Sequence, residues 1–208
     1  MGPVIETMLR TAKLTKKQRE LCLRGIVQMA MADGVLDDRE KSYLKMFVDE
    51  FFPSIDPFED RLKQPIKDEE LKELDSLEAK KCFVAYLYIT AYIDEDFSKE
   101  EKEFADDITL KVLDKETVDE ILESVRVFLY RRSVFAYAFH YKGLNENFAR
   151  AVAQRFHVDE EKAQEINTQV FNAVMAMRGP YAEASAALAD EESDNEEGSP
   201  DSDASHTN

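Results

Sequence analysis

The chain has 208 residues, enough for one substantial hydrophobic core or two smaller ones, and it lacks any run of 18 apolar residues that would predict a membrane span. Apolar residues make up 44% and charged residues 34%, Trp is absent, and Gly and Pro number only six each, which favours a helical protein over a turn-rich β fold. The net charge of −17 is concentrated in residues 33–120, with 27 acidic and 13 basic side chains, and this argues against nucleic-acid binding.

Two capped helices are predicted in the first quarter of the chain. Thr15 and Gln18 form a capping box, and apolar residues follow at helical spacing until Gly34 allows a turn. Asp37 then caps the next helix, with Glu40 at the third position of its box. The predicted buried stripe of this second helix is Tyr43, Leu44, Phe47, Val48 and Phe51.

A long connector precedes a second pair of helices. Residues 53–67 contain three prolines, and a short acidic helix is predicted from Asp68 to about Leu74. Ser76 opens a helix over 77–92 that is apolar almost all round, so we expect it to be the most buried one. Ser98 and Glu101 form the next capping box, and that helix buries Phe104, Ala105, Ile108 and Val112.

The last part of the predicted domain is also helical. Asp114 caps a further helix, and residues 127–141 alternate like a strand but also fit a helix face, which we prefer because no second strand is available. Asn145 and Asp159 cap the last two helices, and Gly179-Pro180 is expected to stop the final one. Residues 181–208 are acidic and poor in large apolar side chains, so they are predicted to be disordered.

The second pair of helices repeats the first with a shift of 61 residues, which relates segment 16–52 to segment 77–113. The shift places Asp94 on Asp33 and Glu101 on Glu40. The predicted fold is therefore all-α, a bundle of about seven to nine helices built on two pseudo-repeated helix–turn–helix units. Residues 1–180 form the helical domain, and residues 181–208 form an acidic tail.

The two acidic turns have two interpretations. Asp37, Glu40 and Glu101 fit helix caps, because a helix dipole stabilises carboxylates at its N-terminus. Asp33 and Asp94 are not explained in this way, because each lies at the C-terminal end of the preceding helix, where the dipole disfavours a carboxylate. A hard cation such as Ca²⁺ or Mg²⁺ would relieve the repulsion among the clustered carboxylates. The alternatives are caps with a solvated acidic face, or a metal site formed by Asp33, Asp37, Glu40, Asp94, Asp96 and Glu101.

Two familiar kinds of metal site do not fit these residues. In an EF-hand that starts at Asp94, Lys99 would stand at the position of the glycine and Ala105 at the position of the final glutamate. Zinc is disfavoured because no Cys or His accompanies these acidic residues.

The residues of these turns resemble the tellurite-resistance TerB-like domain family. The resemblance rests on Ala32, Asp33, Gly34, Leu36 and Glu40, and on Asp94, Phe97 and Glu101. It covers about residues 15–180 and implies an all-helical bundle whose paired acidic turns bind a divalent metal in bacterial stress systems. The chain departs from the family pattern at Glu95, which replaces a glycine, and in the insert 53–67 and the acidic tail.

Three further features are candidates for function. Cys22 and Cys82 lie in apolar helical patterns and are expected to be buried, reduced thiols, with a redox pair as the alternative. A small basic group lies among aromatic residues, and its side chains either cover an apolar helix or form a docking patch for a partner or for the acidic tail. This group consists of Arg126, Arg131 and Arg132.

These observations favour a non-enzymatic interaction or adaptor module of a bacterial stress or signalling system. No phosphate-binding glycine loop, nucleophile elbow or histidine–carboxylate motif is present. The first residues do not form a signal-peptide pattern, so a cytoplasmic location is expected. We predict protein partners, no nucleic acid, no membrane insertion, and modulation by Ca²⁺ or Mg²⁺. The alternative is a divalent-metal sensor or buffer related to tellurite resistance.

Overall fold

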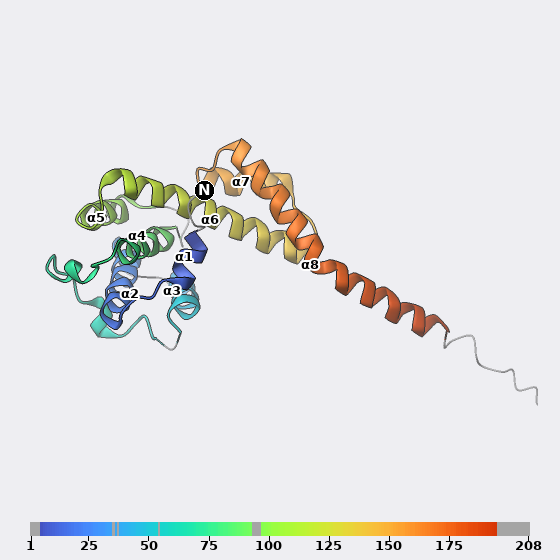
Figure 1. The fold of residues 1–208 in the computed structure, drawn as a ribbon, viewed down its shortest axis with the longest axis horizontal. Helices are drawn as coiled ribbons and strands as arrows, with labels where there is room; N and C mark the ends of the chain where they lie inside the picture. Colours follow the sequence, from blue (N-terminus) through green and yellow to red (C-terminus); the bar gives the residue numbers. More distant parts are fainter. Residues whose placement is uncertain (1–4, 35, 37, 54, 93–96, 195–208) are drawn as a thin grey trace, which may run out of the picture. The chain divides into compact units, whose positions relative to one another are not determined.

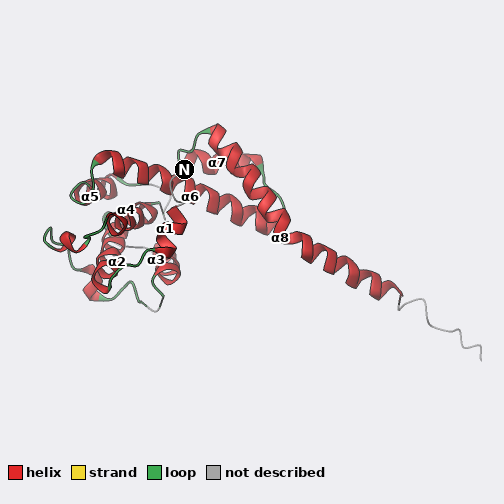
Figure 2. Ribbon diagram, in the orientation of Figure 1, coloured by secondary structure: helices red, strands yellow, loops and turns green. Residues whose placement is uncertain are grey.

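The computed structural model describes residues 5–34, 36, 38–53, 55–92 and 97–194, with the backbone alone for residues 39, 40 and 178–194. Within these ranges all regular secondary structure is helical (Figure 2), and it comprises eight α-helices and two short 3₁₀ helices. The all-α fold class is therefore confirmed. No helix in the described ranges is both long enough and apolar enough to cross a bilayer.

The chain divides into two compact units, residues 1–130 and 131–208, where the sequence predicts one helical domain over 1–180. The first unit contains α1 (Ile5–Thr11), α2 (Lys16–Ala30), α3 (Asp38–Phe51), η1 (Asp60–Lys63), η2 (Glu70–Glu73), α4 (Leu77–Ala91), α5 (Lys99–Thr109) and the first part of α6 (Lys115–Tyr141). The second unit contains the rest of α6, followed by α7 (Glu146–Arg155) and α8 (Glu160–Asp194) (Figure 1).

Helix α4 is the centre of the first unit. Its sequence is apolar on nearly every side, and all residues from Cys82 to Tyr92 are buried, as the sequence predicts. It packs against α1, α2 and α5. Gly25 of α2 permits a close approach of α2 and α4, because a Cβ atom at this position would lie 2.9 Å from Cδ2 of Leu87.

Most predicted helix starts are confirmed where the structure describes them. The Thr15 hydroxyl accepts a hydrogen bond from the backbone N–H of Gln18, and the Gln18 side chain accepts one from the N–H of Thr15. The first-turn N–H groups of α4, α6, α7 and α8 donate to the predicted side-chain caps, which are Ser76, Asp114, Asn145 and Asp159. The expected cap Asp37 lies outside the described residues.

The predicted stripe of α3 is wrong in part. Leu44 and Val48 are buried, and their equivalents in the 61-residue repeat, Ala105 and Thr109 of α5, are buried as well. Tyr43, however, is 41% exposed. Phe47 and Phe51 of the predicted stripe contact the ring of Tyr86 on α4, and so does Phe52, which directly follows α3.

Two helices are longer than predicted. Residues 127–141 continue the helix that Asp114 begins, so α6 is a single helix of 27 residues. Helix α8 runs through Gly179 and Pro180 to Asp194, and the predicted stop at this pair is wrong. The residues that follow are rich in Ala and Glu, which have high helix propensity, and this composition is compatible with a helix that continues past the pair. Residues 195–208 of the predicted tail lie outside the described residues.

The proline-rich connector is held by two side chains of α2, Gln28 and the buried Arg24. Its guanidinium donates to the carbonyl oxygen of Gln64 at 3.1 Å and to that of Pro65 at 2.6 Å. It also forms an ion pair with Glu70 at 2.7 Å, and only 8% of the arginine side chain is exposed. Each proline lacks a backbone N–H, and Arg24 supplies the donors that two carbonyl oxygens of this segment accept, so these contacts fix its path across α2.

Candidate functional site: a lysine-lined pocket

The predicted metal ligands lie mostly where the structure gives no side chain. Asp37, Asp94 and Asp96 are outside the described residues, and Glu40 is described in the backbone alone. Asp33 is exposed in the turn after α2. Among the described residues, no group of three or more His, Cys, Asp or Glu side chains is arranged to hold a metal ion.

Glu101 is the predicted ligand that the structure describes best, and it serves as a helix cap. Its carboxylate accepts a hydrogen bond from the backbone N–H of Ser98 at 2.8 Å, and the Ser98 hydroxyl accepts one from the N–H of Glu101 at 3.1 Å. The side chain is almost completely buried. The capping interpretation therefore accounts for this residue without a ligand.

The two interpretations of the acidic turns predict different responses to metal. A cation held by Asp33 and Glu101 would raise the melting temperature in millimolar Ca²⁺ or Mg²⁺, and Asp33→Asn would abolish most of the increase. Because Ser98 and Glu101 already cap α5 together, we expect no metal-dependent shift and a loss of about 1 kcal/mol for Ser98→Ala with or without metal. A metal-induced shift that Asp33→Asn removes would establish the cation site instead.

Two arginines of the predicted docking group make contacts inside the chain. Nε of Arg126 donates to the hydroxyl of Tyr92 at 2.9 Å, which joins α6 to the end of α4. A terminal nitrogen of Arg131 donates to Gln169 of α8 at 2.6 Å, and Arg132 is exposed. These contacts favour the interpretation in which Arg126 and Arg131 cover and fix helices.

The two cysteines are buried free thiols. Cys22 lies on α2 and Cys82 on α4, and burial raises the pKa of both, to about 12 for Cys82. Thiols of this kind are protonated at neutral pH and react slowly. The structure therefore agrees with the expected core role of both residues.

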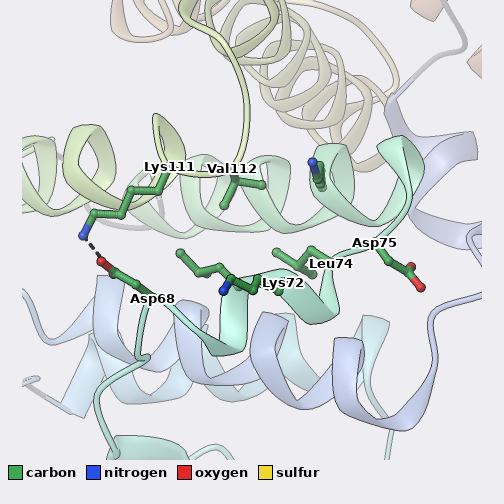
Figure 3. A pocket seen from close by; sticks show the side chains of 8 residues that line it. Asp68, Lys72, Leu74, Asp75, Lys111 and Val112 are labelled. Atoms are coloured by element: carbon green, nitrogen blue, oxygen red, sulfur yellow. Dashed lines mark hydrogen bonds and ion pairs between the residues drawn. The ribbon is translucent and has the colours of Figure 1, made fainter.

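A different group of residues forms a pocket of about 400 Å³ beside η2, the start of α4 and the turn after α5. Figure 3 shows this pocket and the side chains around it. Its apolar lining comes from Leu71, Leu74 and Val112, all of which are largely buried. The polar lining consists of Asp68, Lys72, Asp75, Lys80 and Lys111.

Three of the charged groups in this pocket are already engaged. Lys111 forms ion pairs with Asp68 at 3.1 Å and with Asp107 at 2.9 Å, and these hydrogen bonds raise the pKa of its ammonium group. The Asp75 carboxylate accepts a hydrogen bond from Gln18 of α2 at 2.9 Å. Lys111, Asp68 and Asp75 therefore each have a partner within the chain.

Lys72 and Lys80 are the two cations of the pocket for which the described residues provide no hydrogen bond or ion pair. They belong to different elements, η2 and α4, and they share a cavity whose lining is partly apolar. Two ammonium groups beside buried leucines suit a ligand with a carboxylate and an aliphatic part. The lining therefore offers two ammonium groups to an acidic ligand, and no single motif in the sequence marks this pocket.

A second cavity, of about 310 Å³, lies beside Arg24 and is lined by Lys17, Leu21 and four glutamates. The Arg24–Glu70 ion pair lies in its wall, and the hydrogen bond with Arg24 lowers the pKa of Glu70 to about 2. Arg24 and Glu70 pair with each other and hold the connector, so their charges already have a structural role and we assign no ligand to this cavity.

Comparison with known proteins gives no relative for this chain: no protein-family model, no curated protein and no solved structure matches it. The resemblance to TerB-like domains stays a prediction from the sequence.

Proposed function

We propose that this chain is a non-enzymatic interaction module of a bacterial stress or signalling system, and that it binds an acidic segment of a partner protein at the pocket of Lys72 and Lys80. The observation that carries the proposal is the pair of ammonium groups without partners among the described residues, placed beside Leu71 and Leu74.

The electrostatic setting of the pocket supports an acidic ligand. Residues 33–120 carry far more acidic than basic side chains, so lysines in this region have many carboxylates available as partners. Lys111 forms ion pairs with two of these carboxylates, whereas Lys72 and Lys80 form none with the carboxylates that the structure describes. A partner that supplies a carboxylate would complete these pairs, and an adjacent aliphatic side chain would cover the leucines.

A fragment titration tests this proposal without knowledge of the partner. Hexanoate joins a carboxylate to an aliphatic chain, and in NMR titrations of the ¹⁵N-labelled full chain it should shift the amide signals of residues 68–75, 80 and 111–112 at millimolar concentration. Lys72→Glu and Lys80→Glu should each weaken this binding at least fivefold, because they replace attraction by repulsion.

The matched control is Lys102→Glu. Lys102 is exposed on α5 outside the pocket lining, and its replacement changes the net charge of the protein by the same amount. Equal weakening by Lys102→Glu would show that only overall charge matters, and shifts confined to other residues would place the binding elsewhere. Either result would contradict the proposal.

A further inference from the structure

Leu77 is an exposed apolar side chain close to the lysine-lined pocket. It is the first residue of α4, and 59% of it is exposed. Every other apolar side chain of α4, a helix that the structure describes in full, is buried. Leu77 is not part of the lining of the pocket. The packing of the chain itself therefore does not account for a leucine at this position.

Two lysines are the neighbours of Leu77 on the surface of α4. Residues three and four apart on an α-helix have Cβ atoms about 5–6 Å apart, so Leu77 lies beside Lys80 and Lys81. Lys80 lines the pocket. Lys81 is partly buried, as Lys80 is, and the described residues provide neither of them with a hydrogen bond or an ion pair. An apolar side chain thus adjoins two cations that lack a carboxylate partner in the described part of the chain.

One exposed leucine is common on protein surfaces and does not mark a site by itself. Leu77 differs because one helical turn separates it from a partly apolar cavity of about 400 Å³ that already contains Lys72 and Lys80 (Figure 3). A segment that covers both the cavity and Leu77 would meet the ammonium groups of Lys72, Lys80 and Lys81. Charge complementarity therefore favours an acidic partner segment over a neutral or basic one.

We propose that the acidic segment bound at the pocket also carries a large aliphatic side chain, and that this side chain packs on Leu77. The proposal rests on the proposed binding of an acidic segment and names a further feature of that segment. Leu77 then determines specificity, because it distinguishes acidic segments that carry such a side chain from those that do not.

The spacing on α4 indicates where the aliphatic residue lies in the partner segment. In an extended segment, residues two apart point to the same side and lie about 7 Å apart. This distance is close to the separation of Leu77 and Lys80 on the helix surface. A leucine two residues from an acidic residue therefore reaches Leu77 while the carboxylate lies beside Lys72 and Lys80.

Two blocked peptides of equal charge test the role of Leu77. Acetyl-leucyl-alanyl-glutamyl amide and acetyl-alanyl-alanyl-glutamyl amide differ in one side chain, and NMR titrations of the ¹⁵N-labelled full chain give both dissociation constants. The leucine peptide should bind at least fivefold more tightly than the alanine peptide, because it removes more apolar surface from water. Leu77→Ala should weaken binding of the leucine peptide at least threefold and change binding of the alanine peptide less than twofold.

Met46→Ala is the matched control, since Met46 is 68% exposed on α3 and lies outside the pocket lining, and it should change neither affinity. Hexanoate separates this inference from the proposed function. If hexanoate shifts the pocket signals but Leu77→Ala weakens both peptides equally or weakens neither, the inference is overturned and the proposed function stands. If hexanoate shifts none of the pocket signals, the proposed function itself is contradicted, and the inference fails with it.

Discussion

Arg24→Met should lower the free energy of unfolding by about 3 kcal/mol at pH 7. The change leaves the carboxylate of Glu70 without its cationic partner and removes the donors to the carbonyl oxygens of Gln64 and Pro65. Methionine fills a similar volume, so the loss reflects these polar contacts rather than a cavity. Urea denaturation followed by circular dichroism measures it. Lys17→Met is the control, because Lys17 lies on the same helix and its ion pair with Glu73 is solvent-exposed.

The same pair makes part of this loss dependent on pH. The Arg24 guanidinium and the backbone N–H of Lys67 hold the pKa of Glu70 near 2, below the ordinary value of 4.5. Because the folded-state pKa is lowered, the ionised pair stabilises the protein fully above the ordinary pKa and loses this contribution as the pH falls toward 2. The difference between wild type and Arg24→Met should therefore shrink below about pH 4.5. A difference that stays constant down to pH 3 would contradict the ion-pair explanation.

Gly25→Val should cost about 2–3 kcal/mol, even though valine favours helix more than glycine does. A Cβ atom at residue 25 would lie 2.9 Å from Leu87 and 3.0 Å from the ring of Phe83, and valine adds two methyl groups beyond it. Thermal unfolding of the variant measures the loss. Gly143→Ala is the control, because no atom lies within 4 Å of a Cβ placed there, so it should be neutral or slightly stabilising.

A double-mutant cycle shows whether this cost comes from the contact of α2 with α4. Leu87→Ala alone should destabilise through a cavity, but in combination with Gly25→Ala the added methyl group occupies part of that space. The two changes should therefore cost less together than the sum of their separate costs. Simple additivity would show that Gly25 and Leu87 do not share this packing constraint.

Helix starts were predictable because their signals are local. Thr15 with Gln18, and Ser98 with Glu101, are three residues apart, and each pair satisfies its own backbone groups in the structure. The buried α4 was predictable from composition alone. The end of α8 was not predictable from Gly179 and Pro180, because a local stop signal competes with the helix preference of the residues beyond it.

The candidate site could not be read from the sequence, since it has no motif. Lys72 and Lys80 lie in different elements, and Val112 joins them only after α5 has folded against α4. The role of Arg24 could not be predicted either. In the sequence it is a single charged residue within an apolar helical pattern, and only the fold shows that it holds the connector by donating to Gln64, 40 residues away. Each of these roles depends on which carboxylates and carbonyl oxygens lie nearby in the fold.

Site-specific photocrosslinking in cells tests the central claim most directly. A photoreactive phenylalanine at residue 77, which is exposed at the start of α4 one helical turn before Lys80, should form an adduct with one protein, and mass spectrometry should map the crosslink to an acidic segment of that protein. The same group at residue 102, on the exposed face of α5, should not form this adduct. An adduct from residue 77 that Lys80→Glu abolishes is the predicted result. Identical adducts from residues 77 and 102, or a crosslink mapped to a basic segment, would contradict the account.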